Sequence, residues 1–216
     1  MLLSEEQRTD LFSGYRQLFW GVLLMVFHVS LGPVRLLPDF VCFLMICSGI
    51  GRLRSAADCR ALRRARSVSA LLALVSALEL GVTFVGSAAL FGGEYALPLP
   101  LDIFWQGTRA VLWMLMFCDV FSAAAVLLEK TEDSAAAAQT AGRIRPFLSW
   151  HFLLTAAFLL SRVFSAEPLV QIGVGICLLP LHLWLAHTMN ALKRWYAPGR
   201  EPRSLPADAE ADGAVV

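Results

Sequence analysis

Leu36-Leu37-Pro38-Asp39-Phe40 opens an apolar run over residues 41–51, and a block rich in arginine, residues 52–66, closes it. Proline is favoured in the first turn of a helix, where its missing N–H costs nothing, and a carboxylate beside it meets the positive end of the helix dipole. The stretch therefore predicts a helix that starts at Pro38 and Asp39. Because Lys and Arg collect in cytoplasmic loops, the arginine block predicts that this helix crosses a membrane and ends on the cytoplasmic side.

The whole chain has the composition of a helical membrane protein. Hydrophobic residues make up 57% of its 216 residues and the mean hydropathy is +0.63, whereas soluble domains are about 45–50% apolar. The excess falls in blocks of roughly 18–25 residues, the length that crosses ~30 Å of hydrocarbon. We predict an all-α fold, a polytopic membrane protein of six transmembrane helices in three hairpins. The spans are expected at about residues 13–32, 34–51, 67–91, 102–128, 147–165 and 169–190.

The charges between these spans predict the topology. Of the 18 Lys and Arg residues, 15 fall on the face that holds both termini, so both termini are expected in the cytoplasm. Residues 1–12 form a cytoplasmic or interfacial N-terminus, in which Ser4 and Gln7 fit a capping box. Residues 13–192 form the transmembrane domain, and residues 193–216 a largely disordered cytoplasmic tail. The acidic residues near the start predict no cleavable signal peptide.

Small residues recur at four-residue spacing in the third span, at Ser69, Ala73, Ala77 and Gly81. Small side chains at this spacing let a second helix approach closely. They predict a packing seam on this span.

Ionisable residues inside a membrane are costly, so each is a candidate functional residue. At 1.5 Å per residue, Glu79 lies ~18 Å from the cytoplasmic end of its span, Asp119 ~14 Å and His182 ~10 Å, with His28 somewhat further out. These four residues are expected to form an intramembrane polar cluster that binds a proton or a cation. The alternative is structural, because a carboxyl group buried in apolar surroundings becomes neutral and hydrogen-bonded.

A second group of candidates, Asp39, Arg109 and Arg162, falls in the outer half of the spans. An ion pair between Asp39 and Arg109 would join the second and fourth spans, and the two arginines could hold the phosphate of a lipid head group. The alternative is that Asp39 only begins its helix while both arginines extend their charged ends toward the membrane surface.

Motifs that would indicate an enzyme are absent from the sequence: it contains no HExxH, GxSxG, P-loop or GxGxxG pattern. We expect no catalytic residues, no bound metal and no cofactor. The one basic run lies beside membrane spans, where topology explains it, so we expect no nucleic-acid binding. The expected partners are the lipid bilayer and other membrane proteins.

The first hairpin resembles a group of uncharacterised bacterial membrane proteins, common in Firmicutes, in which a helix containing FWG is followed by a helix beginning LPDF. The resemblance rests on Phe19-Trp20-Gly21 and Leu36-Leu37-Pro38-Asp39-Phe40 and covers about residues 15–55. The family often has an acidic residue near the end of the first helix, where this chain has His28-Val29-Ser30. The resemblance implies a bacterial protein, which we expect to be a multi-pass protein of the cytoplasmic (plasma) membrane, and it implies no particular activity.

Three functions are compatible with these features. The first is a non-enzymatic membrane protein with a scaffold, assembly or regulatory role. The second is a small transporter or channel subunit coupled to protons or cations, for which a cavity that reaches Glu79 would be evidence. The third is a membrane-embedded protein that binds or modifies lipid, for which an outer groove formed by Asp39, Arg109 and Arg162 would be evidence.

Overall fold

Seven helices and one short strand pair make up the described part of the computed structural model, which covers residues 3–26, 30–31, 34–35, 39–89, 99–131, 134–164 and 168–197. The helices are α1 (Glu5–Val26), α2 (Asp39–Ala56), α3 (Arg60–Ala89), α4 (Leu99–Lys130), α5 (Ser134–Gly142), α6 (Ile144–Val163) and α7 (Pro168–Trp195). Between α1 and α2, β1 (Ser30–Leu31) pairs antiparallel with β2 (Val34–Arg35). The predicted all-α fold is confirmed.

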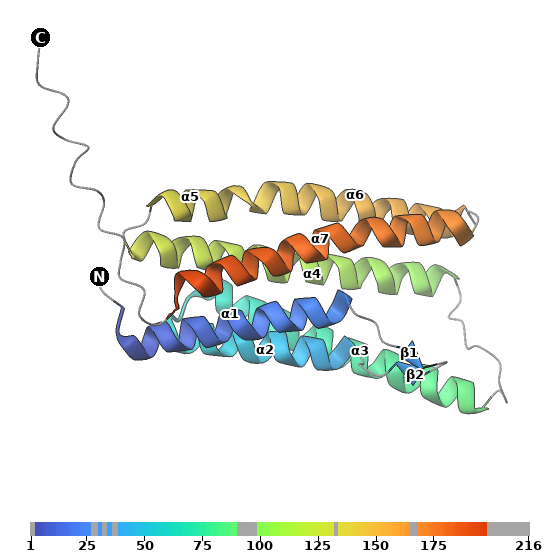
Figure 1. The fold of residues 1–216 in the computed structure, drawn as a ribbon. Helices are drawn as coiled ribbons and strands as arrows, with labels where there is room; N and C mark the ends of the chain where they lie inside the picture. The colour runs from blue at the N-terminus through green and yellow to red at the C-terminus, as the bar shows by residue number, and fades with distance from the viewer. Residues whose placement is uncertain are drawn as a thin grey trace, which may run out of the picture.

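The six long helices run along a common axis and form a closed ring (Figure 1). Each packs on the next long helix in the chain, α1 on α2, α2 on α3, α3 on α4, α4 on α6 and α6 on α7, and α7 returns to pack on α1. The start of α1 and the end of α7 lie at the same end of the bundle (Figure 1). We call this the terminal end and the other the distal end.

Among the described residues, two stretches are long and apolar enough to cross a membrane by length and composition, Leu99–Lys130 and Ser134–Val163. The second covers α5 and α6, and only 17% of its most apolar window is buried inside the molecule. A core helix of a soluble protein would be mostly buried. The apolar surface of α6 is therefore directed outward.

Local signals at the helix starts act as the sequence predicts. α2 begins at Asp39, directly after Pro38. At the start of α1, Gln7 N–H donates to Ser4 Oγ at 3.2 Å and Ser4 N–H donates to Gln7 Oε1 at 3.1 Å, which is the reciprocal capping box. The alanine-rich segment after α4 forms the short helix α5.

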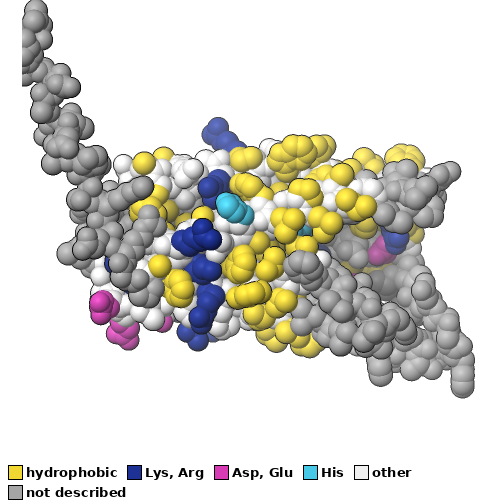
Figure 2. Space-filling model, viewed as in Figure 1, with side chains coloured by type: hydrophobic (Ala, Val, Ile, Leu, Met, Phe, Trp, Pro, Cys, Tyr) yellow, Lys and Arg dark blue, Asp and Glu magenta, His cyan; other side chains and the backbone are white. Residues whose placement is uncertain are grey.

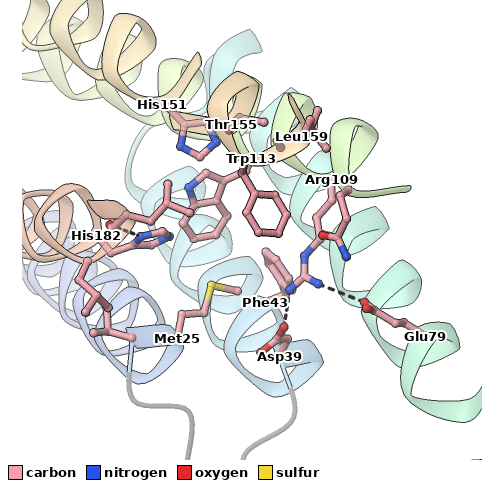
Figure 3. A pocket seen from close by; sticks show the side chains of 16 residues that line it. Met25, Asp39, Phe43, Glu79, Arg109, Trp113, His151, Thr155, Leu159 and His182 are labelled. Atoms are coloured by element: carbon pink, nitrogen blue, oxygen red, sulfur yellow. Dashed lines mark hydrogen bonds and ion pairs between the residues drawn. The ribbon is translucent and has the colours of Figure 1, made fainter. Parts of the chain in front are cut away.

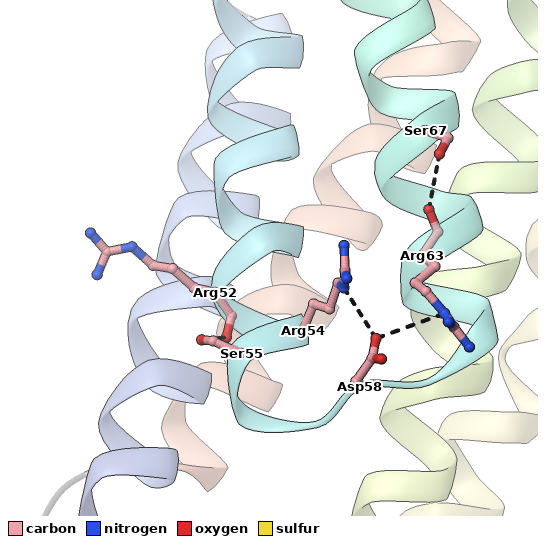
Figure 4. Close-up of polar contacts among 6 residues, drawn as sticks. All are labelled: Arg52, Arg54, Ser55, Asp58, Arg63 and Ser67. Atoms are coloured by element: carbon pink, nitrogen blue, oxygen red, sulfur yellow. Dashed lines mark hydrogen bonds and ion pairs between the residues drawn. The ribbon is translucent and has the colours of Figure 1, made fainter.

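The basic segment, residues 52–66, is not the loop that we expected. It is helical except for residues 57–59, because α2 continues to Ala56 and α3 begins at Arg60. The turn is held by Asp58, whose Oδ1 accepts from Arg54 Nε at 3.1 Å and lies 3.8 Å from Arg63 Nε (Figure 4). All three side chains are exposed enough that each pair contributes about 1 kcal/mol or less.

Of the four small residues that predicted a packing seam on α3, only two are buried in a helix contact. Ser69 and Ala73 are buried, and Ser69 Oγ donates to the Phe43 backbone oxygen of α2 at 3.1 Å. Ala77 is exposed, and no atom of the described part of the chain lies within 4 Å of the place where a Cβ on Gly81 would stand. A close helix contact is found instead between α1 and α2, where a Cβ on Gly49 would stand 2.9 Å from the backbone oxygen of Gly14.

Replacing Gly49 with alanine should therefore push α1 away from α2. A Cβ also meets Leu18 N at 3.2 Å, so backbone must shift, and overpacking of this kind costs about 1–3 kcal/mol. Gly81→Ala is the matched control, because the space around it is open and alanine favours helix. Thermal unfolding of the purified protein measures both. Equal unfolding temperatures for G49A and G81A would contradict the contact.

Candidate functional site

A cavity of about 430 Å³ lies in the distal half of the bundle. All six long helices contribute to its wall: α1 by its last turn, α2 by its first turn, α3 by Glu79, and α4, α6 and α7 by their middle parts. Figure 3 shows labelled side chains from these helices converging on one space. A volume of this size is in the range of sites for small molecules.

Arg109 is the charged centre of the cavity wall. Its Nη1 donates to Glu79 Oε2 at 3.1 Å, and its Nη2 donates to Asp39 Oδ2 (Figure 3). The guanidinium carbon also lies 5.8 Å from the centre of the Phe43 ring, in cation–π contact. One side chain of α4 therefore holds the carboxylates of α2 and α3 together.

The ion pair between Asp39 and Arg109, one of the two alternatives that the sequence left open, is formed in the structure. Arg162 does not join it but donates from Nη2 to Asp102 Oδ2 at 2.6 Å, which ties α6 to the start of α4. Both arginines are thus engaged by carboxylates. Asp102 was not among our candidates, although its place in the first turn of an apolar helix was a signal for it.

The expected cluster of Glu79, Asp119, His28 and His182 is wrong as a single site. Asp119 takes no part in the cavity wall and accepts from Arg64, with Nε at 2.6 Å from Oδ2 and Nη2 on Oδ1. It lies ten residues after Arg109 on α4, which is about 15 Å along the axis. His28 lies outside the described residues. Glu79 and His182 do share the cavity.

The pair between Arg64 and Asp119 stands at the terminal end of the bundle. The Asp119 side chain is 4% exposed and the Arg64 side chain 65%. The hydrogen bonds and the charge of Asp119 raise the pKa of the Arg64 guanidinium above its ordinary value. Arg64 therefore compensates a buried carboxylate from the surface, and the role is structural.

His151 is a polar residue of the cavity wall whose ring nitrogens are not satisfied among the described residues. It is 5% exposed, and neither Nδ1 nor Nε2 makes a hydrogen bond of normal geometry to a described residue, although the backbone of Ala110 lies beside the ring. Its ring stacks on Phe147 with a centroid distance of 5.7 Å. By contrast, the Nδ1 of His182 lies 2.8 Å from the Leu178 backbone oxygen, and its ring is 5.8 Å from Trp113.

Comparisons with family models, curated proteins and solved structures give no match for this chain. The resemblance to LPDF-containing bacterial membrane proteins stays a prediction. Among the described residues, no group of three or more His, Cys, Asp or Glu side chains is placed to hold a metal ion. What the site can do must be argued from its own geometry.

Replacing His151 with phenylalanine should stabilise the protein without ligand. Phenylalanine keeps the stacking on Phe147, and it removes two buried nitrogens whose unsatisfied state costs about 1–3 kcal/mol. His182→Phe is the matched control and should destabilise, because it loses a made hydrogen bond. The free energy of unfolding in detergent measures both. Destabilisation of H151F to the extent of H182F would contradict the account of His151.

Proposed function

We propose that this chain is a multi-pass membrane protein whose six long helices, α1, α2, α3, α4, α6 and α7, are all spans. Large hydrophobic side chains are exposed on each of the six, including Trp20, Leu44, Leu74, Phe104, Phe152 and Ile176. A soluble protein rarely exposes contiguous apolar surface beyond a few hundred Å². The shortest of these helices, α2, has 18 residues and is about 27 Å long, close to the thickness of the hydrocarbon.

The charge distribution supports the orientation. On the face seen in Figure 2, Lys and Arg side chains form a band nearer the terminal end, and hydrophobic side chains fill the area on its distal side. Exposed arginines come from several helices, among them Arg16, Arg52, Arg66, Arg145 and Arg194. Under the positive-inside rule the terminal end faces the cytoplasm of a bacterial cell. The cavity then lies in the outer half of the membrane.

We further propose that the cavity binds a small ligand and that the protein is a small transporter coupled to protons or cations. The observation that carries this is the cavity wall, in which Asp39, Glu79 and Arg109 meet inside an apolar bundle. Ionisable groups at such depth are costly and mark pathways for ions and substrates. A scaffold role needs no cavity with ionisable walls, so the cavity favours the transporter over the scaffold.

The binding of a lipid phosphate receives less support. It would need a pair of arginines directed into one groove. Arg162 is instead held by Asp102, and Arg109 by two carboxylates. Arg162 is also not part of the cavity wall.

Labelling of single cysteines tests this proposal. Thr155 lines the cavity, whereas Phe152 lies one turn before it on α6 and is 66% exposed on the apolar surface. In a variant without the five native cysteines, a membrane-impermeant thiol reagent added outside intact cells should label Thr155→Cys and leave Phe152→Cys unlabelled. Water reaches the first position, and lipid covers the second.

The opposite results have separate meanings. Labelling of Phe152→Cys would contradict the membrane span. Protection of Thr155→Cys from outside would contradict a water-accessible outer cavity, and with it the transporter.

A further inference from the structure

Three basic side chains from three neighbouring helices lie close together on the surface of the bundle, around α1. Arg16 is exposed on α1 itself. Arg52 of α2 is also exposed and donates from Nη1 to Ser13 Oγ of α1 at 2.9 Å. On the other side, the Nζ of Lys193 on α7 lies 5.2 Å from the centre of the Phe19 ring of α1. Both flanking cations are therefore held against α1.

The geometry of α1 places Arg16 between the other two cations. Ser13 and Phe19 each lie three residues from Arg16, which is about 4.5 Å along the axis, and about 60° from it around the axis, on opposite sides. The order along the surface is therefore Arg52, Arg16, Lys193, and we call these three residues the basic arc. Figure 2 shows Lys and Arg side chains gathered in a band across the face that α1 and α7 form, with hydrophobic side chains on its distal side.

The basic arc has no carboxylate paired with it in the described part of the chain. Arg52 points away from the turn at Asp58, where other arginines are paired (Figure 4). Asp10 of α1 lies six residues before Arg16, about 9 Å toward the terminal end, and its Oδ2 accepts from Ser55 Oγ at 2.8 Å. The charge of the arc is therefore open to an anion from outside the bundle.

Aromatic side chains adjoin the arc on its distal side. Phe19 and Trp20 come about one turn after Arg16, and their rings meet edge to face with a centroid distance of 5.3 Å. Trp20 is 46% exposed. Tryptophan is enriched at membrane surfaces, where its ring packs on acyl chains just below the head groups. This place on α1 therefore suits a molecule with an anionic head and an apolar tail.

We propose that the basic arc binds the phosphate of an anionic phospholipid in the cytoplasmic leaflet, with the acyl chains against Phe19 and Trp20. Guanidinium groups present N–H donors in the geometry that a phosphate accepts, and basic clusters beside a membrane attract anionic lipids. The inference rests on the proposed function, because the proposed orientation puts the arc at the cytoplasmic surface. The site is separate from the cavity, which lies in the distal half of the bundle.

Native mass spectrometry of the full-length protein in a neutral detergent measures the binding of single lipids. The probes are dioleoyl phosphatidylglycerol, which is anionic, and dioleoyl phosphatidylcholine, which has the same acyl chains and no net charge. Phosphatidylglycerol should bind roughly tenfold more tightly. Arg16→Gln should weaken the binding of phosphatidylglycerol about fivefold, the usual effect of one basic residue at an anionic surface, and leave the binding of phosphatidylcholine unchanged.

Arg145→Gln is the matched control. It removes the same charge from an exposed arginine of α6, a helix that packs on α4 and α7, and the affinity for phosphatidylglycerol should not change. Arg16→Lys keeps the charge and should keep most of the affinity. Equal affinity for the two lipids, an equal loss in Arg16→Gln and Arg145→Gln, or equally tight binding of glycerophosphoglycerol, the head group without acyl chains, would each overturn the inference.

Failure here is distinguishable from failure of the proposed function. If Phe152→Cys is protected and the two lipids bind equally, the membrane span stands and the lipid site is wrong. If Phe152→Cys is labelled, the span of α6 is contradicted, whichever lipid binds more tightly in detergent.

Discussion

The guanidinium of Arg109 is the interaction on which the rest of the structure depends. It contacts Asp39 at the start of α2 and Glu79 on α3, so three helices meet at one charged group. The three side chains are between 10% and 29% exposed. In surroundings of low dielectric constant, each charge is stabilised by the opposite charge beside it. The position of α4 relative to α2 and α3 is therefore fixed by a polar contact within an apolar bundle.

Helix α4 makes contacts between oppositely charged side chains at three positions along its length. Asp102 is bound by Arg162 of α6, Arg109 binds α2 and α3, and Asp119 is bound by Arg64 of α3. Next to these contacts the helix buries Trp113, Phe117 and Phe121, whose rings touch aromatic rings of α2, α6 and α7. The cavity lies beside the middle contact. The functional candidate is thus built from the same groups that position the helices.

Much of the fold could be predicted because its signals are local. The sequence Pro38-Asp39 predicts the start of α2, which begins at Asp39, and Ser4 and Gln7 form the capping box of α1. The arginines of residues 52–66 gave an orientation but not their own conformation, since helix and loop both keep them at the surface. Only two stretches pass the test for a membrane helix on the described residues, and the six-span topology stays a proposal.

The site was harder to predict because distance along a helix does not give the direction of a side chain. The estimated depth in the membrane grouped Glu79 with Asp119. In the structure Glu79 pairs with Arg109 and Asp119 pairs with Arg64, at different levels of the bundle. The sequence did not predict that His151 lines the cavity, because the direction of a side chain relative to the other helices is a property of the fold. The contact of Gly14 with Gly49 was missed for the same reason, as it needs the register of α1 on α2.

The measurement that tests the account most directly is the stability of Arg109→Gln alone and together with Asp39→Asn and Glu79→Gln. Removing the guanidinium leaves two carboxylates without it inside the bundle, and we predict a loss of about 3–5 kcal/mol in the free energy of unfolding. Neutralising both carboxylates in the same chain should recover most of that loss. A loss below about 1 kcal/mol for Arg109→Gln, the size of a surface pair, or no recovery in the triple variant, would contradict the claim that this one charged group holds the three helices together.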